Sequence, residues 1–165
     1  MKSIILLISF FTATIQTLDV DTIRNAYKGT AQDDSKAEAF YNSLMRVSEN
    51  DKVELVGYKA AAIALKSKQG KTLKDKKNGF IEGVTLLENT IKKEPNNIEL
   101  RFIRLTIQEN TPKLLKYKAD IESDKQFILK QYQSIASRSL KNYLKDYILQ
   151  SKGFTDKEKA VILTE

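Results

Sequence analysis

Arg101 and Arg104 are the side chains of this sequence best suited to bind a charged partner. They lie about one helical turn apart in a segment that is otherwise apolar, and Gln108 continues the same stripe about one turn later. A planar guanidinium group binds a carboxylate through two parallel hydrogen bonds. The stripe of Arg101, Arg104 and Gln108 is therefore our candidate site for binding an acidic group of a partner.

The same two arginines could instead hold the protein together. Arginines on a mostly enclosed helix need counterions whether or not they bind a partner. Glu94, Asp120 and Asp124 are the candidate counterions, and the spacing of the two aspartates matches that of the arginine pair. We expect this internal ion pair to form, and binding of a partner is the alternative.

The residue types that most often catalyse reactions are absent. The chain of 165 residues has no cysteine and no histidine, which excludes disulfides, thiolate metal sites and imidazole acid–base chemistry. It has no Gly-x-Ser-x-Gly turn and no phosphate-binding Gly-x-x-x-x-Gly-Lys loop. Asp120, Glu122 and Asp124 alternate as in a calcium loop, but the glycine and the closing glutamate are missing, so we interpret them as helix-capping residues. We expect no enzyme, no cofactor, no metal and no small-molecule substrate.

Positive charge is concentrated in two segments of a chain whose formal net charge is +7. Residues 66–77 contain six lysines and one aspartate, and residues 113–152 contain nine basic and four acidic residues, whereas residues 19–54 are acidic. Such segments form either an ordinary solvated surface, which we favour, or a surface that binds anionic polymers or lipid headgroups.

The N-terminus is typical of a secretory signal peptide. Residues 1–17 contain one lysine, an apolar run from Ile4 to Phe11, and then small or polar residues. The run is shorter than the roughly 20 apolar residues that a membrane-spanning helix requires. We therefore expect residues 18–165 to form a single exported, soluble domain in the periplasm or outside the cell.

Helix start signals recur along the rest of the chain. Four predicted capping boxes place a capping side chain three residues before a glutamate. They are Ser35–Glu38, Asp51–Glu54, Asn96–Glu99 and Thr155–Glu158. Apolar residues recur between them with helical spacing, and Tyr143 and Tyr147 share such a face with leucines, so we interpret both as core. The predicted fold is all-α, with helices near residues 19–30, 35–48, 51–69, 73–94, 97–109, 120–133, 136–151 and 155–163.

The predicted helix at residues 97–109 has two apolar sides. Pro95 ends the preceding helix because it has no amide hydrogen, and Asn96 or Asn97 can cap the next one. One side carries Ile98, Phe102 and Leu105, and the other carries Leu100, Ile103 and Ile107. Since only the arginine stripe is polar, we expect neighbouring helices to enclose this helix on most of its circumference.

The segment before Pro95 resembles the second helix and corner of a tetratricopeptide repeat. Gly83, Leu87, Thr90 and Pro95 occupy the positions at which that family has a small residue, a large apolar residue, a small residue and a proline. The same offsets recur, without the proline, at Ala37, Tyr41, Leu44 and Glu49. The resemblance covers about residues 35–110. It implies stacked antiparallel helical hairpins in a right-handed α–α arrangement, with a concave surface that binds proteins, and we expect about seven to eight helices in the whole domain. The segment LENTIKKEPNNIELRFIRL is also similar to those of short exported helical proteins of bacteria.

These observations lead us to expect an exported, non-catalytic α-helical module that binds a protein or peptide. The alternative is a protein that binds anionic envelope polymers or a membrane surface through its lysine-rich helices. A protein partner predicts one stoichiometric complex, whereas the alternative predicts binding that weakens as salt is added.

Overall fold

Eight α-helices and three short 3₁₀ helices form the regular structure of the residues that the computed structural model describes, which are 18–30, 33 and 35–163. The α-helices are α1 (Val20–Thr30), α2 (Lys36–Leu44), α3 (Val53–Lys66), α4 (Leu73–Lys93), α5 (Ile98–Asn110), α6 (Ile121–Gln131), α7 (Arg138–Gln150) and α8 (Asp156–Val161). The 3₁₀ helices are η1 (Ser67–Gln69), η2 (Lys113–Leu115) and η3 (Tyr132–Ser134). The all-α prediction is confirmed, and the predicted signal peptide at residues 1–17 lies outside the described residues.

Reciprocal capping boxes begin two of the helices. At α8, the Thr155 side chain accepts from the amide of Glu158, and the Glu158 carboxylate accepts from the amide of Thr155, as predicted. Thr72 and Asp75 form the same arrangement at the start of α4. This second box was not predicted, because aspartate takes the place of the usual glutamate.

The other three predicted capping boxes are wrong. Asn97, and not Asn96, caps α5, and its side-chain oxygen accepts from two amides of the first turn. Ser35 makes no side-chain cap bond to α2, and the residue before α3 makes none either. The side chains of Ser35 and Asp51 instead form hydrogen bonds within the loops that precede these helices, Asp51 with Ser48.

Helices α3 and α4 cross closely because small residues face each other. A Cβ atom on Gly83 would lie 2.7 Å from both the carbonyl oxygen of Ala60 and the amide nitrogen of Ala64. Only glycine permits this approach of the two backbones. Gly83, the small residue of the tetratricopeptide resemblance, therefore has a packing role.

Two apolar cores share α5. The first core lies among α1 to α5 and receives Leu100, Ile103 and Ile107 from α5. The second lies among α5 to α8 and receives Phe102 and Leu105. All five side chains are buried, so the predicted enclosure of this helix on two sides is confirmed.

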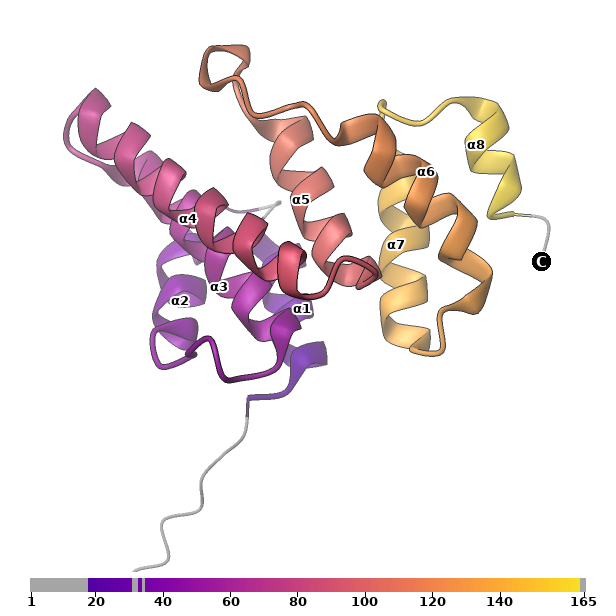
Figure 1. The fold of residues 1–165 in the computed structure, drawn as a ribbon, viewed down its shortest axis with the longest axis horizontal. Helices are drawn as coiled ribbons and strands as arrows, with labels where there is room; N and C mark the ends of the chain where they lie inside the picture. The colour runs from indigo at the N-terminus through magenta and orange to yellow at the C-terminus, as the bar shows by residue number, and fades with distance from the viewer. Residues whose placement is uncertain (1–17, 31–32, 34, 164–165) are drawn as a thin grey trace, which may run out of the picture.

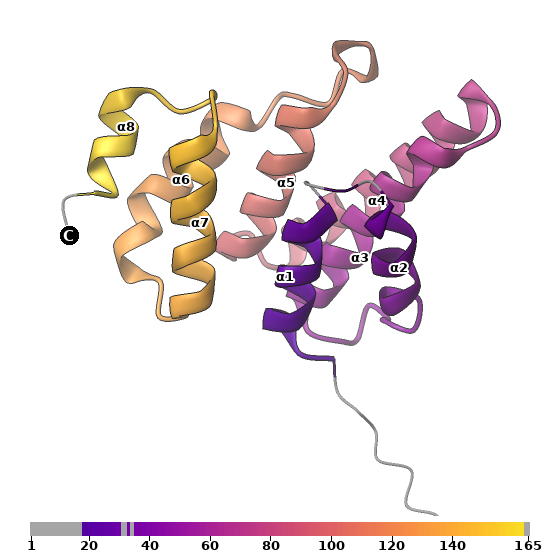
Figure 2. The ribbon, with the colours of Figure 1, turned by 180° about the vertical axis from the view of Figure 1, so that it is seen from behind.

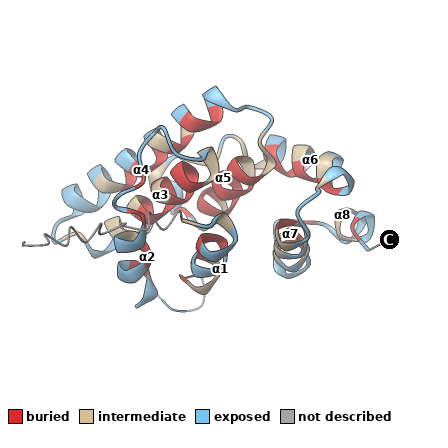
Figure 3. Cartoon of the chain, turned by 90° about the horizontal axis from the view of Figure 1, so that it is seen from below, coloured by how far each residue is buried: buried red, intermediate tan, exposed pale blue. Residues whose placement is uncertain are grey.

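Because both apolar cores include side chains of α5, the other helices lie on either side of it. Helix α5 lies at the centre of the molecule, with α1 to α4 on one side and α6 to α8 on the other (Figures 1 and 2). Buried residues are prominent on α3 and α5 in Figure 3. Tyr143 and Tyr147 of α7 pack edge-on against Phe102, with ring centroids 5.1 and 5.0 Å apart, which confirms their interpretation as core residues.

The longest helix is amphipathic. Helix α4 has 21 residues, and charged side chains occur along its whole length. Within the described ranges, none of the helices combines the length and the apolar character needed to cross a bilayer. This agrees with the sequence beyond the predicted signal peptide, where no segment is apolar over such a length.

Candidate functional site

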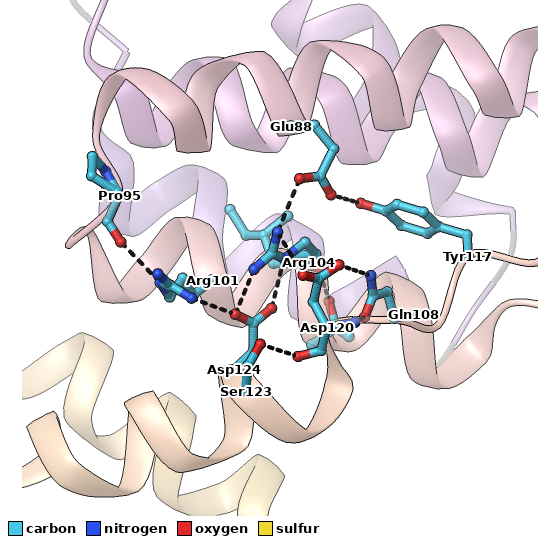
Figure 4. A network of polar contacts seen from close by, with 11 residues as sticks. Glu88, Pro95, Arg101, Arg104, Gln108, Tyr117, Asp120, Ser123 and Asp124 are labelled. Atoms are coloured by element: carbon cyan, nitrogen blue, oxygen red, sulfur yellow. Dashed lines mark hydrogen bonds and ion pairs between the residues drawn. The ribbon is translucent and has the colours of Figure 1, made fainter.

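The stripe of Arg101, Arg104 and Gln108 faces α6 and α4 (Figure 4). Asp124 of α6 binds both arginines. Arg104 donates to its two carboxylate oxygens, with Nε–Oδ2 and Nη2–Oδ1 distances of 2.7 Å, and Arg101 Nη1 donates to Oδ1 at 3.0 Å. Asp124 is fully buried. The predicted internal ion pair is therefore confirmed, with Asp124 as the carboxylate.

Glu88 and Asp120 extend this network toward the surface. Arg104 Nη1 donates to Glu88 Oε2 at 2.9 Å and lies 3.6 Å from Asp120 Oδ1. Gln108 is fully buried, donates to Asp120 Oδ2 and accepts from the amide of Asp120, both at 3.2 Å. The side chains of Glu88 and Asp120 are 29% and 39% exposed, so this edge of the network reaches solvent. Asp120 does not cap α6 with its side chain, contrary to the sequence interpretation, because that side chain binds α5.

We name this network the α6 centre: Arg101, Arg104, Asp124, Glu88 and Asp120. Burial alone would lower the pKa of the Arg104 guanidinium, because the charged form loses hydration. The hydrogen bonds and charge of Asp124, together with the charges of Glu88 and Asp120, outweigh burial and raise this pKa. Burial, followed by the hydrogen bond to Glu88, also raises the pKa of Tyr117. At neutral pH the arginine is therefore charged and the tyrosine is not.

Arg101 is the arginine of the stripe that solvent can reach. Its side chain is 20% exposed, whereas that of Arg104 is 7% exposed and Gln108 is fully buried. Arg101 also donates from Nε to the carbonyl of Pro95 at 2.9 Å and lies over the ring of Phe127 at 4.4 Å. The role of these three residues in binding a partner stays a prediction.

A second buried arginine centre joins α1 to α5, and the sequence analysis missed it. Arg24 donates to both carboxylate oxygens of Glu99, with Nε–Oε1 at 2.7 Å and Nη2–Oε2 at 2.9 Å. The hydroxyl of Tyr58 donates to Glu99 Oε1 at 2.6 Å, and Arg24 also pairs with Asp21 at the surface. Arg24, Glu99 and Tyr58 are 3%, 4% and 0% exposed. We name these four residues the α1 centre.

Glu99 has a different role from the one that its local sequence indicates. The sequence analysis assigned it to a capping box, whereas its partner Arg24 lies 75 positions away in the chain. The signal that could have revealed the pair is the place of Glu99 on an enclosed helix, because a buried carboxylate needs a counterion. Burial, then the charge of Glu99, raises the pKa of Tyr58, so this hydroxyl remains a donor.

A surface pocket of about 240 Å³ lies where the start of α5 meets the connection between α6 and α7. Ile98, Ile135 and Leu140 are its large apolar lining residues. The other lining residues are Asn96, Gln131, Ser134, Ala136 and Ser137. This combination of apolar and polar residues can accept an apolar side chain and bond the backbone next to it.

The carboxylates of the α6 centre are poorly arranged for a metal ion. Glu88, Asp120 and Asp124 converge on the positively charged Arg104, which would repel a cation at their centre. In the part of the chain that the structure describes, no three histidine, cysteine, aspartate or glutamate side chains form a group suited to a metal.

We compared the chain with models of protein families, with curated proteins and with solved structures, and none of the three comparisons finds a significant match.

Proposed function

We propose that this protein is an exported, non-catalytic α-helical module that binds a segment of another protein. The observation that carries the proposal is the pocket between α5 and α7. Its volume of about 240 Å³ is below the roughly 300–1,000 Å³ typical of pockets for small-molecule ligands. Such a pocket suits one apolar side chain of a partner, held by Ile98, Ile135 and Leu140, with polar groups around it for the partner's backbone.

We also propose that the helices form a right-handed stack of the tetratricopeptide kind. What supports this is the pattern of contacts, because α1, α3 and α5 touch one another in turn while each also packs against its neighbours in sequence. Alternate helices form one layer of such a stack.

We propose that Arg101 contributes to the same binding surface. Phe127, on which its guanidinium lies, is four residues before Gln131 in α6, and Gln131 lines the pocket. Residues four apart are neighbours on a helix surface, so Arg101 and the pocket form one continuous strip. In this proposal Arg101 binds an acidic group of the partner, while Arg104 and Gln108 hold Asp124 and Asp120 in place beside it.

Substitution at Ala136 tests the proposal. Ala136 is exposed and lines the pocket, so Ala136→Arg should block the pocket without changing the melting temperature. Ala160→Arg makes the same change at an exposed position of α8 and is the matched control. In affinity capture from a cell extract, one stoichiometric protein should bind the parent and Ala160→Arg but not Ala136→Arg. The same proteins on both variants, or none on the parent, would contradict the proposal.

Export is tested separately, by mass spectrometry of the native chain. The expected N-terminus is that of a chain lacking roughly the first 14 to 17 residues, since the apolar run has the dimensions of a signal peptide. An intact Met1 terminus recovered from the cytoplasm would contradict export and leave the pocket proposal standing.

A further inference from the structure

Two tips of the molecule each present an exposed leucine among exposed lysines. The α4 tip comprises residues 71–77, which are the end of the turn before α4 and the first residues of that helix. The loop tip comprises residues 112–116, which include η2 and follow α5. Leu73 in the α4 tip is 86% exposed and Leu114 in the loop tip is 89% exposed, the two highest values among the large apolar residues described. Neither leucine therefore contributes to either core.

The two tips are strongly basic, with a net charge of +3 on the α4 tip and +2 on the loop tip. The α4 tip contains four lysines and one aspartate, the loop tip contains two lysines and no acidic residue, and the whole chain carries +7. All six lysines are exposed: Lys71, Lys74, Lys76, Lys77, Lys113 and Lys116. Asp75 is held by Thr72 in the capping box. The lysine head groups are thus available to an anionic surface.

The two tips lie at the same end of the molecule. The start of α4 and the loop that contains η2 both form the top edge in Figure 1 and again in Figure 2, which is the view from behind. Both tips diverge from one aromatic contact, in which Phe80 of α4 and Tyr117 have ring centroids 5.8 Å apart. Leu73 lies seven residues before Phe80, a rise of about 10 Å along the helix. Both tips are therefore presented on the same side of the molecule in these two views.

Both tips are held in a defined conformation. The capping box of Thr72 and Asp75 fixes the first turn of α4. A Cβ atom on Gly70 would lie 2.8 Å from the backbone nitrogen of Lys76, so the turn before α4 packs closely on it. In the loop tip, Lys116 has a positive φ of 51°, and Leu115 and Tyr117 on either side of it pack against the first core. The leucines and lysines are presented by rigid supports.

We propose that this end of the protein docks onto a bilayer that contains anionic phospholipids. Leu73 and Leu114 enter the boundary between headgroups and acyl chains, and the lysines around them pair with lipid phosphates. The inference goes beyond the proposed binding of a protein and does not depend on it. The pocket lies at the start of α5, whereas the loop tip follows the end of that helix, so the two surfaces can act at the same time.

The exposed leucines favour a bilayer over an anionic polymer. Lysines alone would serve a polysaccharide or a nucleic acid equally well. A hydrated polymer offers no apolar phase for the leucines at the apex of each tip, and these two side chains would remain in water. The lysines should make the affinity for the bilayer depend on salt concentration. The leucines should contribute the share of that affinity that added salt does not weaken.

Sedimentation with vesicles tests the roles of these residues, using vesicles of phosphatidylcholine with and without phosphatidylglycerol. The parent should bind only the anionic vesicles. Leu73→Ser with Leu114→Ser should weaken this binding about tenfold, and Lys74→Gln with Lys116→Gln should weaken it by a similar factor. The matched controls are Leu149→Ser with Leu163→Ser and Lys130→Gln with Lys157→Gln, which change exposed residues of α6 to α8 and the C-terminal end and should bind as the parent does.

Fluorescence gives a second, direct measurement, because the chain contains no tryptophan. Leu114→Trp places a single reporter in the loop tip, and Leu149→Trp places the control on α7. The emission of the first should shift to shorter wavelength with anionic vesicles, and that of the second should not.

Three results would overturn the proposal. They are absence of binding to anionic vesicles, binding that the lysine substitutions weaken but the leucine substitutions leave unchanged, and equal emission shifts at both tryptophan positions. The second result would indicate an anionic polymer as the ligand. None of them bears on the pocket, which Ala136→Arg tests on its own.

Discussion

The α1 centre and the α6 centre each contain a buried pair of an arginine and a carboxylate, but α5 supplies the opposite member of the pair in each. Helix α5 contributes the carboxylate of Glu99 to the first and the guanidinium of Arg104 to the second. In the α1 centre the paired arginine and glutamate side chains are 4% and 5% exposed. In the α6 centre Arg104 and Asp124 are 7% and 0% exposed, but two further acids connect them to solvent. The α1 centre reaches solvent through one acid, Asp21, and the α6 centre reaches it through two. We call the first the closed centre and the second the open centre.

The two centres differ in which partners remain for a charged side chain when its main partner is removed. If Glu99 is removed, Arg24 keeps one acidic partner, the half-exposed Asp21, and a hydrogen bond to the hydroxyl of Ser139. If Arg104 is removed, Asp124 keeps Arg101, and the neighbouring acids can be hydrated. Because an unpaired buried charge costs more than an unpaired hydrated one, the closed centre should be the more sensitive to substitution.

The largest effect is expected from Glu99→Leu. This change leaves the guanidinium of Arg24 buried and the hydroxyl of Tyr58 without its acceptor. We expect the free energy of unfolding in urea at neutral pH to fall by about 3–5 kcal/mol, as for other buried pairs that lose one partner. A loss below about 1 kcal/mol would mean that the centre is hydrated and not closed.

A triple variant is the control for this result. Arg24→Met, Glu99→Leu and Tyr58→Phe together remove the three buried members of the network. The remaining partners of Arg24, Asp21 and Ser139, are not buried and can be hydrated. Stability should recover toward that of the parent, because a packed apolar cluster can replace a buried ion pair. A triple variant as unstable as Glu99→Leu would indicate a packing defect in place of an unpaired charge.

A smaller loss is expected from Arg104→Met in the open centre. Asp124 loses its bidentate partner but keeps the hydrogen bond from Arg101. We expect the free energy of unfolding to fall by about 2–4 kcal/mol. The comparison itself would be reversed if, in the same urea titration, Arg104→Met were less stable than Glu99→Leu.

The two centres also show what the sequence can and cannot reveal. The part of the α6 centre that involves Asp120 and Asp124 was predictable, because these residues follow the arginines closely and have matching spacing. Glu88 of α4 was not predicted, and it takes the role expected of Glu94. The α1 centre was not, since Arg24 and Glu99 are 75 positions apart and only the fold brings them together. Local patterns predict partners that lie on consecutive helices, and a distant partner leaves no such pattern.

The same contrast holds for the fold and the surfaces. Helix positions and the two apolar sides of α5 follow from periodicity, which is a local property. The lysine-rich segments 66–77 and 113–152 were visible in the sequence. That the start of α4 and the loop at residues 112–116 lie at one end of the molecule depends on the contact between Phe80 and Tyr117. The pocket at Ile135 arises where two connections meet, and it could not be predicted from either one alone.

Alkaline pH should weaken both centres, because Tyr58 in the α1 centre and Tyr117 beside the α6 centre each donate a hydroxyl hydrogen bond to a carboxylate of the centre. Burial raises the pKa of Tyr58 and Tyr117 above the ordinary value of 10.0, and it raises the pKa of Tyr27 to about 12. A raised pKa means that the folded state favours the neutral phenol. The associated stability is therefore complete below pH 10.0 and is lost as the pH rises above it, through about 12 in the case of Tyr27 and higher for Tyr58 and Tyr117.

This pH dependence is measured by melting curves at increasing alkaline pH, with tyrosinate absorbance recorded in parallel. Tyr58→Phe and Tyr117→Phe should each lower stability at neutral pH, because a carboxylate loses a donor, and each should reduce the decline above pH 10.0. Melting temperatures that stay constant across this range would contradict the raised pKa values.

The smallest effect on stability is expected from Arg101→Met, at the edge of the open centre. Asp124 retains both hydrogen bonds from Arg104, and the methionine can still pack on Phe127, so the loss should be below about 1 kcal/mol. If Arg101 also binds an acidic group of a partner, the same variant should weaken capture of that partner while melting almost as the parent does. Arg101→Lys is the informative control, because it keeps the charge and loses the planar fork. A large loss of stability in Arg101→Met would instead place Arg101 with Arg104 as a structural ion pair and leave the pocket as the binding surface.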